Sequence, residues 1–507
     1  MFPKSFLWGT SIAGFQFEMG DLTRKSLDPN TDWFKWVHDA ENIRKKVVSS
    51  DLPEDGINYW ELYRADHDLA KGLGMNAYRL GIEWSRIFPE STAGIDVDVE
   101  KASDGGVARV NLDQGDIQKL KSLANNEALK HYESVIDDLR DKGFKVIVCL
   151  NHFTLPLWVH DPIAVRDSKL RKGPRGWYDS ESVVEFAKYA AFLAWWLGDR
   201  VDIWVTFNEP MVIAEVGYLL GMEGFPPGLE NDLNAFRRVA VNLATAHARA
   251  FDMIKKFDTY RSEPDSPDPA WVGVIHNVIP ATPKDASDEV DIQATQFIDR
   301  MHNAFFVEAT TSGWLDTNFN GIRDEVRSYL ADKLDWLGVN YYTRMVVKGK
   351  RSLLAKIFTG IPVLPDLVPG YGFACKRSDY SLDGRPTSDF GQELYPEGIG
   401  QALIQMSRYN RPMYVTENGT ADAQDQLRPR YIVEHLKVIE RTIEEKRKDV
   451  RGYLHWALTD NYEWAQGFKM RFGLISVDLQ TKKRVPRGSA QVFHRIVESC
   501  TTQGIQV

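Results

Sequence analysis

Short apolar runs rich in β-branched and aromatic residues alternate with longer amphipathic stretches along the whole chain. The short runs predict eight strands, at Phe6–Thr10, Asn76–Ile82, Lys145–Asn151, Ile203–Phe207, Val272–Asn277, Trp336–Asn340, Met413–Thr416 and Tyr453–Ala457. The amphipathic stretches predict helices, among them His131–Lys142, Ser182–Leu197, Leu243–Phe257, Ile298–Ser312 and Arg430–Lys446. This alternation is typical of strand–helix units that build a parallel sheet.

Eight strand–helix units close most economically into a barrel, which favours the α/β class. An open doubly wound sheet is the alternative, but no glycine-rich phosphate loop follows the first predicted strand. We therefore expect a single catalytic (β/α)8 TIM-barrel domain over residues 1–507. Two long insertions, Glu90–Asn126 and Val346–Asp389, follow the second and sixth strands. Both lie at the face where barrels carry their active sites, and they could shape the access to a site or serve contacts between subunits.

The composition and charge of the chain limit the kinds of binding partner and the cellular compartment that we expect. The chain has 62 basic and 71 acidic residues and a net charge of −9, without long blocks of either sign, which favours a neutral substrate over nucleic acid. Its three cysteines, Cys149, Cys375 and Cys500, are too few and too widely spaced for a disulfide framework or a metal site. No signal-peptide pattern begins the chain, and no apolar run approaches the roughly 18 residues of a membrane span. We expect a cytoplasmic protein without membrane association or a metal ion.

Two glutamates that follow predicted strands carry the main chemical hypothesis. The fourth strand leads into Asn208-Glu209-Pro210 and the seventh into Glu417-Asn418-Gly419. Residues just past the strands of a barrel share one mouth, so these carboxyl groups can face one point. With a barrel radius of about 7.5 Å and side chains that reach inward by roughly 4 to 5 Å, the two groups lie about 5 Å apart. That separation favours retaining over inverting cleavage of a glycosidic bond, which needs one carboxylic acid and one carboxylate.

The sequence resembles glycoside hydrolase family 1, particularly its archaeal β-glycosidases, nearly from end to end. The segments that carry the resemblance read FLWGTSIAGFQFE, NAYRLGIEWSRIFP, NHFTLPLWVHDP, TFNEP, GVNYYT, YVTENG and HWALTDNYEWAQGFKMRFG. The resemblance implies that Glu209 is the general acid/base and Glu417 the nucleophile, with a covalent glycosyl-enzyme between two inversions. It also implies that Asn208 binds the 2-hydroxyl of the sugar and that Arg79 and Tyr342 hold Glu417. The cation should keep Glu417 ionised while Glu209 stays protonated, so the environments of the two glutamates should differ.

The resemblance also implies a set of residues that bind the substrate. Trp456 matches the platform on which the sugar ring stacks, and the other members are Gln16, His152, Asn340, Glu463, Trp464 and Phe472. Amide, carboxylate and indole groups suit this role, because they donate or accept hydrogen bonds with hydroxyls or present an apolar face. Two positions depart from the pattern of many relatives, which have tryptophan where this chain has Phe153 and Gln392. The second departure is expected near the aglycone side.

The implied activity is hydrolysis of terminal β-D-glucosyl and β-D-galactosyl residues from β-glucosides, β-galactosides and short β-linked oligosaccharides, with no cofactor. A 6-phospho-β-glycosidase is disfavoured because Glu463, Met470 and Phe472 stand where such enzymes bind the phosphate, and a carboxylate would repel it. The retention of both glutamates argues against a thioglucosidase and against a silent sugar-binding barrel. A β-mannosidase is a further alternative. The archaeal resemblance also implies a thermostable homo-oligomer, with a tetramer as the expected form.

Overall fold

The computed structural model describes residues 1–264, 266–353 and 361–505, and its centre is a closed barrel of eight parallel strands. Around the ring the order is β1, β15, β14, β11, β7, β6, β5 and β2. The bounds are β1 Leu7–Ser11, β2 Ala77–Gly81, β5 Lys145–Asn151, β6 Ile203–Asn208, β7 Trp271–Asn277, β11 Trp336–Asn340, β14 Met413–Asn418 and β15 Val450–His455. Leu7 pairs with Gly452 and Thr10 with His455, so the first and last barrel strands close the sheet. The predicted (β/α)8 barrel is confirmed, and the open doubly wound sheet is excluded.

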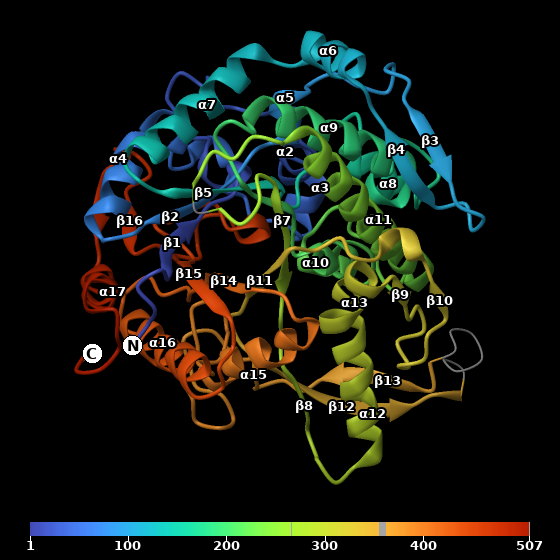
Figure 1. Cartoon of the computed structure of the whole chain (residues 1–507). Helices are drawn as coiled ribbons and strands as arrows, with labels where there is room; N and C mark the ends of the chain where they lie inside the picture. The colour runs from blue at the N-terminus through green and yellow to red at the C-terminus, as the bar shows by residue number, and fades with distance from the viewer. Residues whose placement is uncertain (265, 354–360, 506–507) are drawn as a thin grey trace.

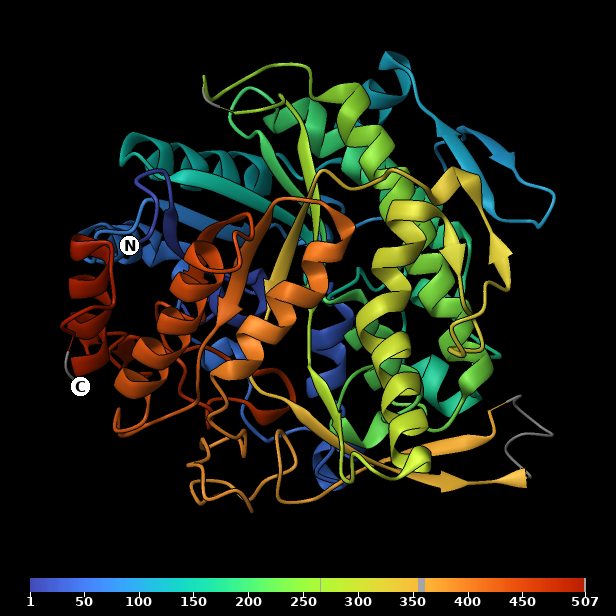
Figure 2. The same cartoon turned by 60° about the horizontal axis from the view of Figure 1, so that its bottom comes forward.

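Helices surround the barrel strands (Figure 1). Eight of them are α4 Tyr59–Gly72, α7 Asn126–Asp141, α9 Glu181–Leu197, α11 Leu233–Phe257, α13 Phe305–Ser312, α15 Glu397–Met406, α16 Arg428–Glu444 and α17 Gly488–Ser499. Helix α9 is apolar on nearly all sides because it is buried between the barrel and its neighbours. The two chain ends lie side by side (Figures 1 and 2), where Phe2 N donates to Cys500 O at 2.9 Å.

Three helix predictions were wrong in their bounds. The helix expected at His131–Lys142 begins five residues earlier, at Asn126. The helix expected at Leu243–Phe257 begins ten residues earlier, after Asp232, whose side chain accepts a hydrogen bond from Ala235 N as a helix cap. The helix expected at Ile298–Ser312 is divided into the end of α12 (Glu289–Ile298), a π-helical turn at Asp299–Ala304, and α13. Within the π turn, the Asn303 amide exchanges hydrogen bonds with the backbone of Ile279, at 3.0 and 2.9 Å. This contact joins the turn to the segment that follows β7.

The two predicted insertions form separate small structures. Glu90–Asn126 contains the hairpin of β3 Asp98–Lys101 and β4 Val107–Asn111, followed by α6 Gln114–Leu123, and the hairpin projects from the edge of the molecule (Figure 2). Most of β12 Met345–Arg351 and all of β13 Val363–Leu367 lie in Val346–Asp389, of which residues 354–360 are outside the described residues. These strands join β8 Ala281–Pro283 in a three-stranded sheet. Helix α12 packs on this sheet, where its Ala294 forms a small apolar cluster with Met345, Val347 and Val363 of the strands.

The remaining elements are short. The helices are α1 Gly14–Phe17, α2 Asp32–Val37, α3 Ala40–Arg44, α5 Trp84–Ile87, α8 Pro162–Ser168 and α10 Pro210–Tyr218, and the strand pairs are β9 Trp314–Leu315 with β10 Glu325–Val326 and β16 Ile475–Val477 with β17 Arg484–Pro486. Short 3₁₀ turns lie at Pro53–Asp55, Gly176–Tyr178, Gly221–Glu223, Ser328–Leu330, Ser407–Tyr409 and Trp464–Gln466.

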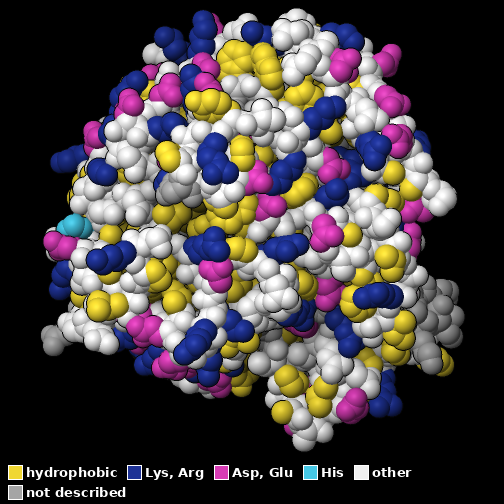
Figure 3. Space-filling model, in the orientation of Figure 1, with side chains coloured by type: hydrophobic (Ala, Val, Ile, Leu, Met, Phe, Trp, Pro, Cys, Tyr) yellow, Lys and Arg dark blue, Asp and Glu magenta, His cyan; other side chains and the backbone are white. Residues whose placement is uncertain are grey.

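Side chains divide the barrel interior into an apolar lower part and a polar mouth. The apolar cluster contains Ala77, Ile147, Cys149, Val205, Trp271, Ile275, Trp336, Tyr414 and Leu454. Above it, the carboxyl ends of the strands carry buried polar groups such as Arg79, Asn208 and Glu417. On the outside, basic and acidic side chains are intermixed over the face in Figure 3. Within the described ranges, no helix has the length and apolar character needed to cross a membrane.

Candidate active site

The two glutamates predicted to be catalytic project from the ends of β6 and β14. Glu209 follows β6 and precedes α10, and its backbone is left-handed, with φ 49° and ψ 57°. Its N–H donates to Ile275 O at 2.8 Å, and Pro210 begins the helix at a position where proline is favoured. A left-handed conformation is uncommon for a residue other than glycine, and it turns the chain sharply from strand to helix. Glu417 lies within β14, opposite Asn340 of β11 in the strand register.

Two amide groups hold one oxygen of Glu209, and no described residue donates to the other. Oε1 accepts from Asn277 Nδ2 at 3.0 Å and from Asn340 Nδ2 at 2.7 Å, whereas Oε2 has no hydrogen bond from any described residue. Burial, and after it the negative charge of Glu417, raises the pKa of Glu209 to about 7. Near neutral pH this carboxyl group therefore exists in both protonation states, and Oε2 is the oxygen available to carry the proton.

Glu417 has the opposite environment, because donors reach both of its oxygens. Arg79 Nη2 donates to Oε1 from a fully buried position on β2, and Tyr342 OH donates to Oε2 at 2.6 Å. Burial and the charges of Glu417 and Glu209 raise the pKa of Tyr342 well above its ordinary value of 10, so this hydroxyl keeps its proton. A cation and a neutral hydroxyl thus both donate to this carboxylate. The two glutamates therefore have different hydrogen-bond partners.

Asn208 links these groups, and its orientation determines which ring nitrogen of His152 carries the hydrogen. Its Oδ1 accepts from Arg79 Nη1 at 3.2 Å and from Asn340 Nδ2 at 3.0 Å, which identifies the oxygen and turns the amide nitrogen toward His152. Asn208 Nδ2 lies 3.1 Å from His152 Nε2, and burial together with the charge of Arg79 lowers the pKa of His152 well below 6.5. The neutral imidazole therefore accepts at Nε2 and carries its hydrogen on Nδ1. Among the described residues, Nδ1 has no acceptor and remains available to a ligand.

The other predicted binding residues surround the same mouth. Gln16 directs Nε2 to Tyr462 O at 3.0 Å and Glu463 Oε2 at 3.3 Å, while its buried Oε1 has no partner in the described structure. The ring of Trp456 lies 5.9 Å from that of His152, and the Trp464 ring lies 5.8 Å from it, both in roughly stacked orientations. The structure therefore brings Gln16, Glu463, Trp456 and Trp464 together around His152.

Two predicted binding residues are in the site but are engaged mainly with the protein. Asn340 donates to both Asn208 and Glu209, and its Oδ1 accepts from Thr416 Oγ1 at 2.8 Å. Phe472 is buried, with its ring 6.2 Å from that of Tyr342 in an edge-on arrangement. Phe153, one of the departures from the family pattern, also has a left-handed backbone (φ 76°), and its ring lies 5.0 Å from that of Trp464.

Asn277 is the residue of the site that the sequence reasoning missed. It ends the fifth barrel strand as Asn340 ends the sixth, and both amides reach the same oxygen of Glu209. Its position at a strand end was the available signal, because such residues face the barrel mouth. Over the described ranges, no group of three histidine, cysteine or acidic side chains is arranged to hold a metal ion.

Known proteins resemble this chain over nearly its whole length. Residues 1–98 and 118–502 match the family described as Glycosyl hydrolase family 1, and the gap between them spans most of the β3–β4 hairpin. A β-galactosidase of Pyrococcus woesei is 50% identical over 501 residues, which are 98% of this chain and 97% of the relative. The crystal structure of the β-glycosidase from the hyperthermophile Thermosphaera aggregans superposes with a TM-score of 0.89 at 42% identity, covering 100% of this chain and 98% of the other.

A β-glucosidase mutant derived from a hyperthermophilic tetrameric structure is also similar. It is 43% identical, with a TM-score of 0.85, and the match covers 99% of this chain and 96% of the other.

Proposed function

The chain belongs to glycosyl hydrolase family 1 and is a β-glycosidase, and from this premise we propose that it is a retaining exo-β-glycosidase with Glu209 as acid/base and Glu417 as nucleophile. The observation that carries the proposal is the contrast between the two carboxyl groups. Glu209 has one oxygen without a donor among the described residues, and its pKa is raised to about 7. Glu417, in contrast, accepts hydrogen bonds from Arg79 and Tyr342. One group is suited to transfer a proton and the other to act as an anion.

In the first step, the Glu417 carboxylate attacks the anomeric carbon while Glu209 gives its proton to the glycosidic oxygen. A glycosyl ester forms, the glycosidic bond breaks, and the aglycone leaves as an alcohol. The ester no longer carries the charge of Glu417, which is one of the causes that raise the pKa of Glu209. The pKa of Glu209 therefore falls when this group must act as a base. In the second step, ionised Glu209 takes a proton from water, which attacks the anomeric carbon and releases Glu417 after a second inversion.

The preferred glycones are terminal β-D-glucosyl and β-D-galactosyl residues. Gln16 Oε1 and His152 Nδ1 provide an acceptor and a donor that no described residue uses. Burial, followed by the charges of Glu417 and Glu209, raises the pKa of Glu463 to about 8, so at neutral pH this side chain donates as well as accepts. A group with both capacities suits hydroxyls in either epimeric arrangement. Asn208 is assigned to the 2-hydroxyl, Trp456 to the face of the sugar ring, and Trp464 and Phe472 to the walls.

Asn340 has a supporting role in this proposal, because its hydrogen bonds to Asn208 and Glu209 orient two functional groups at once. Residues 1–507 act as one catalytic domain that needs no cofactor and assembles as a homo-tetramer. The description of one similar structure as derived from a tetramer supports the assembly. Light scattering on a size-exclusion column measures it directly.

External azide with two glutamate variants tests the mechanism. Glu417→Gly should lose nearly all activity on 4-nitrophenyl β-D-glucoside, and azide should restore turnover with an α-glucosyl azide product, since only one inversion occurs. Glu209→Ala should still form the glycosyl-enzyme from this activated substrate and yield the β-azide. The opposite pair of products would exchange the two roles. A Glu417→Gly variant that keeps most of its activity would refute the assignment, and a wild type inactive on β-glucosides and β-galactosides would refute the substrate class.

A further inference from the structure

A long irregular segment, residues 368–396, lies between β13 and α15 and contacts the loops of three barrel strands. We call it the 368–396 loop. Asp389 N donates to Ala421 O at 2.9 Å beyond β14, and Arg377 Nη2 donates to Gln466 Oε1 at 3.0 Å beyond β15. The third contact is with residues 341–344, which follow β11. A loop of this length without regular structure is uncommon in a compact domain and is often functional, so its anchors are informative.

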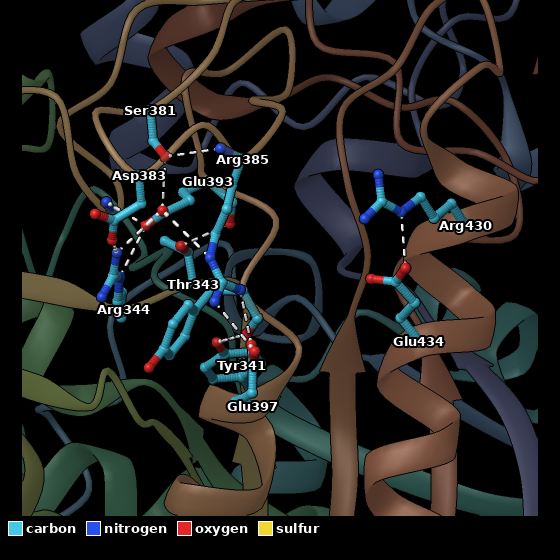
Figure 4. A network of polar contacts seen from close by, with 12 residues as sticks. Tyr341, Thr343, Arg344, Ser381, Asp383, Arg385, Glu393, Glu397, Arg430 and Glu434 are labelled. Atoms are coloured by element: carbon cyan, nitrogen blue, oxygen red, sulfur yellow. Dashed lines mark hydrogen bonds and ion pairs between the residues drawn. The ribbon is translucent and has the colours of Figure 1, made fainter.

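The main anchor is Glu393, whose side chain is completely buried (Figure 4). Its carboxylate accepts from Arg344 Nε at 2.8 Å and Arg344 Nη2 at 3.0 Å. It also accepts from Gly372 N at 3.0 Å and Ser381 Oγ at 2.8 Å, both within the loop. A buried carboxylate is costly unless it is paired and fully hydrogen-bonded, and here a guanidinium and two further donors satisfy it. Glu393 thus joins separate parts of the loop to the residue that lies two positions after Tyr342.

Further contacts hold the chain on both sides of Tyr342. Tyr341 OH donates to Tyr395 O, and Thr343 Oγ1 donates to Glu393 O at 2.8 Å. The Arg344 guanidinium also stacks over the Tyr395 ring at 4.3 Å. Residues 341, 343 and 344 are therefore all attached to the loop, while Tyr342 between them donates to Glu417.

We propose that Glu393 is a positioning residue for the nucleophile: by fixing Thr343 and Arg344 it holds the Tyr342 hydroxyl on Glu417. The inference rests on the proposed function, in which Glu417 attacks the anomeric carbon. Displacement of a catalytic group by about 1 Å can cost on the order of 100-fold in rate. Loss of the Glu393 anchor should therefore slow the formation of the glycosyl-enzyme. It should leave Gln16 and His152, which follow β1 and β5, able to bind a sugar.

Glu393→Gln tests this link, because it removes the charge and keeps the shape. The kcat on 4-nitrophenyl β-D-glucoside should fall by about 10- to 100-fold. The rate of inactivation by 2-deoxy-2-fluoro-β-D-glucosyl fluoride, which depends on Glu417 and little on the acid, should fall by the same factor. The inhibition constant of glucose should change by no more than about twofold, since uniform binding is retained. An equal loss of glucose binding would indicate general loosening of the site and would overturn the proposal.

Two acidic residues that are less buried than Glu393 provide matched controls. Asp383 pairs with the same arginine, Arg344, but its side chain is 44% exposed, and Glu434 forms an exposed pair with Arg430 on α16 (Figure 4). Exposed ion pairs contribute little, so Asp383→Asn and Glu434→Gln should keep kcat and the inactivation rate within about twofold of the wild type. A loss in Asp383→Asn as large as that in Glu393→Gln would overturn the role of the buried carboxylate.

Folding and function can be separated by two further comparisons. If Glu393→Gln does not fold, Thr343→Val removes only the bond to Glu393 O, and its inactivation rate should fall by several-fold. A folded Glu393→Gln, or a folded Thr343→Val, that is inactivated at the wild-type rate would overturn the proposal. A wild type that the fluorosugar does not label would instead remove the proposed function on which the inference rests.

Discussion

Replacement of Glu209 by glutamine is expected to stabilise the protein above neutral pH while removing the proposed acid/base. Glutamine keeps an oxygen that can accept from Asn277 and Asn340, and it cannot ionise. In the wild type the folded-state pKa of Glu209 is raised from 4.5 to about 7. The folded protein therefore disfavours the charge, and the stabilising effect of the protonated group, complete below pH 4.5, is lost as the pH rises to about 7. The shift corresponds to about 3 kcal/mol, which Glu209→Gln should recover at pH 8.

Thermal unfolding of the two proteins at a series of pH values measures this difference. For 507 residues, about 3 kcal/mol corresponds to a rise of about 3 °C in Tm. The Tm values should coincide near pH 4.5, separate between pH 4.5 and 7, and remain separated at pH 8. Glu434→Gln, which removes a carboxylate that is 34% exposed, should show no pH-dependent separation. A difference that does not vary with pH, or a Glu209→Gln variant less stable at pH 8, would contradict a raised pKa of Glu209 in the folded protein.

Three further predictions concern catalysis. The kcat/KM for 4-nitrophenyl β-D-glucoside should fall about tenfold per pH unit above pH 7, because ionised Glu209 has no proton to donate. A profile of kcat/KM that stays flat to pH 9 would contradict this prediction. Asn277→Ala removes one of the two donors on Glu209, so kcat for phenyl β-D-glucoside should fall by about tenfold. The loss should be smaller for 2,4-dinitrophenyl β-D-glucoside, because its leaving group needs little acid assistance. Equal losses on the two substrates would argue against this role of Asn277. Arg79→Lys should lower kcat by about 100-fold, because one ammonium cannot replace the two guanidinium nitrogens that donate to Glu417 and Asn208. A kcat within threefold of the wild type would show that these two contacts are dispensable.

The pattern of the sequence predicts the structure most accurately where local preference and overall fold agree. Each predicted barrel strand overlaps an observed one, because buried parallel strands appear as short apolar runs bounded by polar residues. Bounds were less accurate: the strand expected at Tyr453–Ala457 is Val450–His455. The π turn at Asp299–Ala304 has no local pattern in the chain, since it depends on the contact of Asn303 with Ile279. The interpretation of 298–312 as one helix failed for this reason.

The candidate site divides in the same way. Residues that stand at strand ends within recognisable motifs, such as Glu209 and Glu417, were identified from the sequence, because the barrel brings all strand carboxyl ends to one mouth. Asn277 was missed since nothing local distinguishes it from other polar residues at strand ends. The buried carboxylate of Glu393 was not singled out either, because its four donors come from positions 344, 372 and 381.

The barrel architecture, the family and the pair of strand-end carboxylates could all be predicted from the chain before its structure was known. These depend on periodicity along the chain and on motifs that are contiguous in it. Three features follow from the folded structure alone: which oxygen of Glu209 has no donor among the described residues, which nitrogen of His152 carries the hydrogen, and how the 368–396 loop is joined to Tyr342. Protonation and orientation depend on burial, charges and hydrogen-bond partners from residues distant in the chain, which a linear pattern does not specify.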